Sequence, residues 1–357
     1  MKYLKSLIIK TLIFFLLINV INCINKKQQE EVKIKFKNLK STLIKSYSES
    51  NMEEIQKHLK HILVERVADT PNHKKVREYI VSQFDKLYWD IEFDSFKDNT
   101  PFGEKTFTNI ILTSKLVNDD DDDIVGVDNK EELSESPKTL ILSAHYDSKY
   151  FKEFSFLGAT DSAVPCSMLI DLAISLQSEI KKSKKRLMII FFDGEEAFKE
   201  WSDTDSLYGS RHLANLLLDK KVITKDNDND LPISSSFYNT VEAFILLDLL
   251  GAPNPRFYMF NKKTESLFKK LSDIEDKLSL KRFISPKPYK YFQNQYIGSN
   301  IQDDHMPFLN YVPTLHIIPY PFPNVWHTEK DNESCLDKNT IEDLSKIFKI
   351  FVGSYLN

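Results

Sequence analysis

The stretch "LMIIFFDGEEAF", residues 187–198, carries the strongest fold signal in the chain. Six largely apolar residues run from Leu187 to Phe192 and meet an Asp, a Gly and two adjacent glutamates. A short run that is apolar throughout is typical of a strand buried on both faces, as in parallel sheets covered by helices. Glu195 and Glu196 then stand at the carboxyl end of a buried strand, where open α/β sheets bind their ligands.

Four further apolar runs have the same character and alternate with amphipathic stretches. The apolar runs predict strands at 105–114, 138–148, 242–251 and 314–319. The amphipathic stretches predict helices at 164–180, 206–218, 262–278 and 339–355. This alternation predicts the α/β class, as a single three-layer domain with a mostly parallel central sheet flanked by helices.

Charge and composition limit the class of partner. The chain has 48 basic and 52 acidic residues and a formal net charge of -4, so no cationic surface for nucleic acid is expected. Two acidic stretches, 118–137 and 225–236, lack the spacing and the glycine of a calcium-binding hand. We interpret 118–137 as a solvated loop insertion between two strands. No long apolar surface calls for a partner subunit, so a monomer is expected.

The N-terminus indicates a route of export. Residues 1–23 combine a lysine-bearing start with a short apolar run, which predicts a secretory signal peptide, with a retained signal anchor as the alternative. Residues 24–357 would then form the catalytic domain of a protein that is secreted or held in the secretory lumen, without a stable membrane partner unless the signal is retained. Asn332 lies in the only N-glycosylation sequon. Cys166 and Cys335 allow at most one disulfide in the mature chain.

Potential metal ligands gather at the predicted strand ends. They are His145, Asp161, Glu196, Asp248 and His327. Carboxylates and imidazoles suit zinc, and a catalytic zinc takes three protein ligands and keeps one position open. In such a site one glutamate of an adjacent pair binds the metal while its neighbour moves protons. This predicts Glu196 as a ligand and Glu195 as the proton carrier.

Seven segments strongly resemble the animal-type glutaminyl-peptide cyclotransferases. They are "AHYDSK" (144–149), "GATDSAVPC" (158–166), "FFDGEEAF" (191–198), "WSDTDSLYGSRHLA" (201–214), "LLDLLGAPNP" (246–255), "QDDHMPFL" (302–309) and "PYPFPNVWHT" (319–328). The resemblance covers roughly residues 30–357 and implies a fold shared with zinc aminopeptidases.

The resemblance also implies roles for particular residues. One zinc ion per chain would be held by Asp161, Glu196 and His327, with Glu195 as the proton shuttle. Asp248 and Asp303 would form a carboxylate network beside it. The positions that would shape or line the substrate pocket are Trp201, Gln302, His316, Phe322 and Trp326.

The reaction implied by the resemblance acts on peptides and proteins with N-terminal Gln. It cyclises this residue to pyroglutamate with loss of ammonia, and N-terminal Glu more slowly with loss of water. Secreted animal members carry a cysteine that pairs with the position of Cys166, but Ala144 stands there. The resemblance therefore implies that this disulfide is missing and that Cys166 is a buried free thiol.

Two other functions remain open at this point. A two-zinc aminopeptidase of the same fold would use His145 and Asp248 for a second metal, with Asp161 bridging the two ions. The five potential ligands do not decide between one metal and two, but "WSDTDSLYGS", "QDDH" and "PFPNVWH" favour the cyclase. A non-enzymatic secreted binding protein is expected to have lost Glu195 or a ligand, and all are present.

Overall fold

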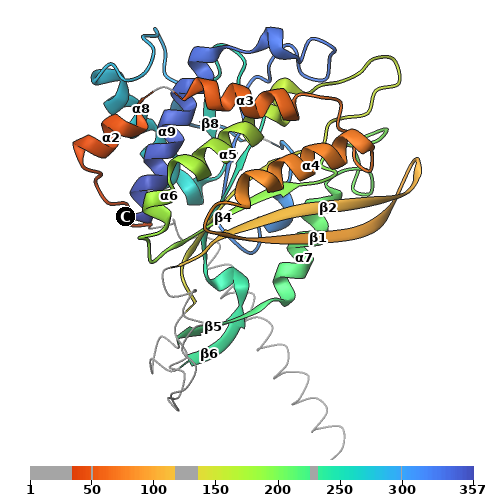
Figure 1. Ribbon diagram of the computed structural model, residues 1–357, viewed down its shortest axis with the longest axis horizontal. Helices are drawn as coiled ribbons and strands as arrows, with labels where there is room; N and C mark the ends of the chain where they lie inside the picture. The colour runs from red at the N-terminus through yellow and green to blue at the C-terminus, as the bar shows by residue number, and fades with distance from the viewer. Residues whose placement is uncertain (1–33, 50, 117–135, 226–231, 299) are drawn as a thin grey trace, which may run out of the picture.

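The computed structural model describes residues 34–49, 51–116, 136–225, 232–298 and 300–357 (Figure 1). The predicted signal peptide, residues 118–135 of the acidic insertion and residues 226–231 of the second acidic stretch lie outside the described residues. Within the described ranges, no helix has the length and apolar character needed to cross a bilayer.

A six-stranded sheet forms the centre of the molecule. Its strands, in order across the sheet, are β1 (Trp89–Thr100), β2 (Gly103–Ser114), β4 (Arg186–Phe192), β3 (Thr139–His145), β7 (Val241–Leu247) and β10 (Thr314–Ile317). The last four are parallel to one another, whereas β1 and β2 form an antiparallel hairpin that joins β4 at one side. The predicted mostly parallel sheet is confirmed, and β1 is a strand that the apolar runs did not predict.

Helices cover both faces of this sheet (Figure 1). They are α2 (Ser41–Tyr47), α3 (Met52–Ile62), α4 (Pro71–Phe84), α5 (Val164–Ser175), α6 (Gln177–Ile180), α7 (Tyr208–Asp219), α8 (Glu265–Leu280) and α9 (Lys338–Leu356). Two small sheets pair β5 (Lys221–Lys225) with β6 (Pro232–Ser236) and β8 (Phe257–Met259) with β9 (Phe292–Tyr296). The four predicted helices are present, although the one predicted at 164–180 is divided at Leu176 into α5 and α6.

The central strand β4 shows why the sheet needs helices on both sides. Successive side chains of a strand point to opposite faces. One set belongs to the large apolar core that also contains side chains from α3, α4, α5, α8 and α9, and it consists of Leu187, Ile189 and Phe191. The other set packs in a smaller core with α7 and consists of Met188, Ile190 and Phe192. Because both faces of β4 are buried, every residue from Leu187 to Phe192 has to be apolar.

The parallel strands bring their carboxyl ends to one edge of the sheet. Strand β3 ends at His145, β4 is followed by the "DGEE" segment, and Asp248 comes directly after β7. The loop beyond β10 leads to His327. Segments that are far apart in the sequence therefore meet at this edge, as expected for an open α/β sheet.

Candidate active site

A cavity of about 630 Å³ lies at the carboxyl ends of the strands. Most of the predicted site residues line it: Asp161, Glu195, Glu196, Trp201, Asp248, Gln302, Asp303, Phe322, Trp326 and His327. His145 and His316 are buried and contact lining residues from behind, through Asp161 and Asp303 respectively. Asn332 is not among the lining residues.

Three of these residues point ligand atoms at a common position. His327 Nε2 lies 3.2 Å from Glu196 Oε1 and 3.4 Å from Asp161 Oδ2. Four ligands at about 2.0–2.1 Å from a tetrahedral zinc are separated from one another by about 3.3 Å. Asp161 Oδ2 is buried and has no hydrogen-bond partner among the described residues. Both the spacing and the unpaired oxygen fit a metal ion.

The charge around His327 has the same implication. Burial disfavours its charged form, but Glu196 and Asp161 outweigh burial and raise the pKa of His327 to about 10. Two largely buried carboxylates thus demand a positive charge at this position. Lys149 supplies part of it, since its Nζ lies 3.3 Å from Glu196 Oε2 and donates to the carbonyl of Ala197 at 3.0 Å.

A second set of potential ligands shares Asp161 with the first. His145 Nε2 lies 3.0 Å from Asp161 Oδ1 and 3.4 Å from Asp248 Oδ1. The Ser162 hydroxyl donates a short hydrogen bond to the same oxygen of Asp248. Asp248 Oδ1 therefore already has two partners, His145 and Ser162. This favours a hydrogen-bonded network at this position over a second metal ion.

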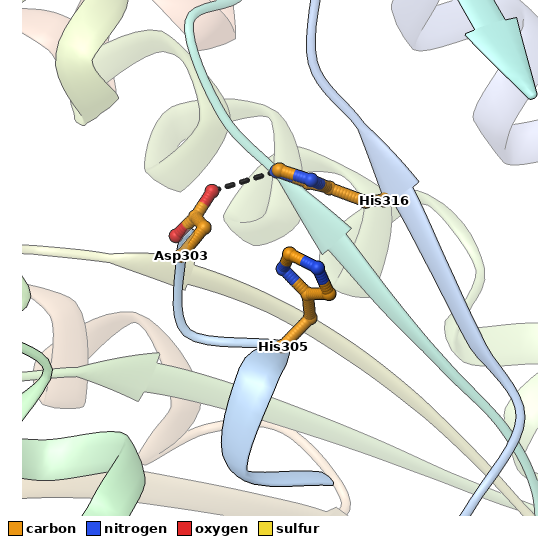
Figure 2. A group of neighbouring side chains, drawn as sticks. All are labelled: Asp303, His305 and His316. Carbon is orange, nitrogen blue, oxygen red and sulfur yellow. Dashed lines mark hydrogen bonds and ion pairs between the residues drawn. The ribbon is translucent and has the colours of Figure 1, made fainter. Parts of the chain in front are cut away.

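A third set of potential ligands consists of Asp303, which lines the cavity, and of His305 and His316, which are not among its lining residues (Figure 2). His316 Nε2 is 2.7 Å from Asp303 Oδ2, which is a hydrogen-bond distance and is shorter than the separation of two ligands on one zinc. Burial lowers the pKa of His316 to about 4 and lowers the pKa of His305 as well, so both rings are neutral. We therefore assign Asp303 and His316 as a hydrogen-bonded pair that fixes the Asp303 carboxyl.

The two glutamates are held in place through their backbone. The Asp147 carboxylate accepts from the N–H groups of Glu195 at 3.1 Å and Glu196 at 3.2 Å. Gly194 has φ +66°, and a Cβ there would lie 2.5 Å from the ring of Phe107. Only glycine fits this turn, and the turn sends two successive carboxylates into one cavity.

The environment of Glu195 suits a group that exchanges protons. Burial raises the pKa of Glu195 well above its usual range, and the charges of Glu196 and Asp303 add to this effect while His145 opposes it. Adjacent glutamates with different surroundings are the arrangement in which one carboxylate binds a cation and the other carries a proton.

The Asp161 loop is fixed by a buried cation. Asp161 lies before α5 in the single turn η1 (Ala159–Ala163), and its backbone angles, φ -117° and ψ 76°, are not helical. The Arg66 guanidinium is fully buried and donates to the backbone carbonyls of Gly158 and Asp161, both at 3.1 Å, and of Tyr146 at 2.9 Å. It also donates to Leu157 through a short bond. The carboxylate of Asp161 is thus positioned through its own main chain.

Aromatic side chains form the outer wall of the cavity. Trp201 Nε1 donates to Gln302 Oε1 at 2.6 Å, and Trp326 stacks on His327 with ring centres 4.1 Å apart. Phe322 meets Trp326 edge to face at 4.9 Å. Trp201 and Trp326 are 38% and 40% exposed, so much of their apolar surface is available to a ligand.

The cysteines match the expectation drawn from Ala144. Cys166 is buried and free, and its thiol donates to the His145 carbonyl at 3.1 Å. Cys335 is also free.

Three supporting residues were not identified from the sequence. Asp147 and Lys149 lie within the quoted segment "AHYDSK", and their position at the carboxyl end of the strand predicted at 138–148 is a signal that could have identified them. Arg66 has no such signal, because it lies at a point in the sequence remote from every motif.

Comparison with known proteins relates the chain to one enzyme family. Residues 124–352 match the model of Peptidase family M28. A glutaminyl-peptide cyclotransferase of Dictyostelium discoideum is 88% identical over 362 residues, which is 100% of both chains. One of Drosophila melanogaster is 43% identical over 310 residues, covering 83% of this chain and 78% of that one.

Solved structures support the same fold. The glutaminyl cyclase of Macrostomum lignano superposes with a TM-score of 0.76 and 32% identity, covering 92% of this chain and 96% of that one. A leucine aminopeptidase precursor of Bacteroides thetaiotaomicron has a TM-score of 0.59 at 19% identity, covering 90% of this chain and 98% of that one. The second likeness concerns the fold alone.

Proposed function

The chain belongs to the glutaminyl-peptide cyclotransferases of peptidase family M28, and from this membership we propose how its residues carry out the reaction. The enzyme converts the N-terminal glutamine of peptides to pyroglutamate and releases ammonia. The observation that carries the proposed mechanism is the spacing of 3.2 and 3.4 Å from His327 to Glu196 and Asp161, in a cavity that Glu195 also lines.

We propose that Asp161, Glu196 and His327 hold one zinc ion per chain. When bound, zinc acts as a Lewis acid that polarises the γ-carbonyl of the substrate glutamine. The unpaired oxygen of Asp161 and the excess of negative charge support these ligands. The hydrogen bond from Ser162 to Asp248 is the reason for proposing one ion and not two.

Glu195 is the proposed proton carrier. The α-amine of the substrate attacks the carbonyl carbon of its own side-chain amide, a C–N bond forms to close the five-membered lactam, and the bond from this carbon to the amide nitrogen breaks. Glu195 takes a proton from the attacking amine and gives it to the nitrogen that leaves as ammonia. The chain supplies no nucleophile, and because the attack is intramolecular its main task is to hold the glutamine folded back on itself.

The remaining lining residues have positioning roles in this proposal. Asp248 and Asp303 accept hydrogen bonds from the substrate amine, and His316 holds Asp303 at 2.7 Å. The walls of the pocket enclose the reacting side chain and exclude water, and they consist of Trp201, Gln302, Phe322 and Trp326.

A peptide that begins with glutamine tests the function directly. The zinc-loaded enzyme is expected to remove one ammonia and leave the chain length unchanged, as measured by mass spectrometry. A peptide that begins with glutamate should lose water more slowly. Shortening of the glutamine peptide by one residue would instead support the two-zinc aminopeptidase, and an unchanged peptide would support a binding protein.

We further propose that the protein enters the secretory route as a monomer and carries a glycan at Asn332. The Asn332 side-chain nitrogen donates to the Glu329 carbonyl at 2.9 Å, at a half-buried position near the surface. Secreted protein from a eukaryotic host is expected to start after the predicted signal and to lose mass on N-glycosidase treatment, whereas Asn332→Gln should show no such loss. Material that keeps residue 1 would contradict signal cleavage.

A further inference from the structure

A groove beside the reaction cavity has no role in the mechanism above. It encloses about 410 Å³ between residues 252–258, which end in strand β8, and the loop 319–324. Leu249 and Phe322 line both the groove and the cavity, so the two spaces share a wall. Substrate residues that leave the cavity past Leu249 and Phe322 would enter this groove.

The groove has preformed walls. The Tyr320 N–H donates to the Arg256 carbonyl at 2.8 Å, and Phe257 forms a β-bridge with Pro319. These contacts join the two segments to each other. Proline also occupies every second position from 319 to 323, which fixes the backbone of one wall. Because little chain has to be ordered, a bound peptide would lose little affinity to rearrangement of the groove.

The charge of the groove is positive. Arg256 is exposed, and among the described residues that line the groove it is the only charged one. Its guanidinium lies over the ring of Tyr289 at 6.0 Å, and no carboxylate is among the described residues that line the groove. Tyr258, Tyr320 and Asn254 add uncharged polar groups. This chemistry suits a carboxylate, which arginine recognises in a bidentate manner.

Two further grooves adjoin the cavity on the side of Gln302. Asn300, Ile301 and Gln302 line both the cavity and one of these grooves, and Gln302 also lines the other. Its side-chain oxygen is held by the Trp201 indole at 2.6 Å. The wall shared with the Arg256 groove consists instead of apolar side chains, over which a peptide can pass without breaking a hydrogen bond.

We propose that this groove binds the residues that follow the reacting glutamine of a peptide substrate, and that Arg256 favours an aspartate or glutamate among them. The inference rests on the proposed function, since both reacting groups of the substrate lie inside the cavity and the rest of the peptide must leave it. An extended peptide advances about 3.3 Å per residue, so the groove is within reach of the residues just after the glutamine.

The test compares short peptide amides of glutamine followed by alanines, in which one alanine at a time is replaced by Asp or by Lys. The measured quantity is kcat/KM relative to the all-alanine peptide, so that any general effect of a variant cancels. For the native enzyme at low ionic strength, Asp at one or more positions should raise this ratio about two- to fivefold through a lower KM, as an exposed ion pair does. Added salt should remove the preference.

Three variants locate the preference. Arg256→Glu should reverse the order, so that Lys is preferred over Asp at the same position. Lys263→Glu changes a lysine of the neighbouring groove beyond Gln302, and Lys184→Glu changes an exposed lysine before the amino end of β4. Both should keep the native ratio.

The peptide series distinguishes failure of the groove assignment from failure of the proposed function. Failure of the native enzyme to cyclise the all-alanine peptide would reject the function itself. Cyclisation with equal ratios for Asp, Ala and Lys would reject the groove. A preference for Asp that survives in Arg256→Glu, or is reversed by Lys263→Glu, would also overturn this assignment.

Discussion

Glu195→Gln should lower kcat by about 10²- to 10⁴-fold, the usual contribution of a general acid–base group, while zinc stays bound. Glutamine keeps the shape and the backbone hydrogen bond to Asp147, but it cannot take up and return a proton. Peptide turnover and metal analysis of the same preparation provide the measurement. Because the variant removes a transition-state role, kcat should fall more than KM changes.

Glu200→Gln is the matched control, since Glu200 is exposed on the same loop and does not line the cavity. It should retain native turnover. Near-native turnover in Glu195→Gln would remove Glu195 from the mechanism. Loss of zinc together with activity would show instead that Glu195 supports the metal.

His327→Ala is expected to lose zinc as well as activity. The imidazole is one of three proposed ligands, and even residues behind a ligand typically change metal affinity by about 10- to 100-fold, so removal of a ligand should cost at least that much. Metal content after dialysis and turnover with increasing zinc measure the effect. Excess zinc should restore part of the turnover in this variant, but none in Glu195→Gln.

His61→Ala serves as the control, because His61 is an exposed imidazole on α3. Its zinc content should be native. If His327→Ala keeps full zinc occupancy after dialysis, the proposed ligand set is wrong. Glu196→Gln should behave like His327→Ala, with the added effect that Lys149 loses its anionic partner.

The buried parallel strands were predictable because burial on both faces leaves an unmistakable run of apolar residues, as in β4. Strand β1 was missed for the opposite reason. Its sequence "WDIEFDSFKDNT" mixes charged and apolar residues, and its pairing with β2 at the edge of the sheet makes it a strand. The amino-terminal helices α2, α3 and α4 were likewise not predicted, since they are rich in polar residues and contain no long apolar run.

The residues of the candidate site were predictable to a similar extent. The carboxylates and imidazoles at strand ends could be recognised because topology places strand ends together. The proposed difference in role between Asp248 and the three proposed ligands could not be predicted, because it depends on the hydroxyl of Ser162 and on distances that differ by a few tenths of an ångström. Arg66 donates to main-chain carbonyls. Since every residue has such a carbonyl, the sequence contains no particular residue type that would identify its partners.

Arg66 also sets the limits of the smallest unit that can work as an enzyme. The region shared with peptidase family M28 begins at residue 124, yet the guanidinium that satisfies the carbonyls around Asp161 comes from residue 66. A chain cut back to the shared region would leave these buried carbonyls without donors and would strip β2 from the side of β4. The amino-terminal segment is therefore not a detachable module, because the loop that carries Asp161 depends on Arg66. If the core of this protein were transferred to another chain, that chain would have to supply a donor in place of Arg66.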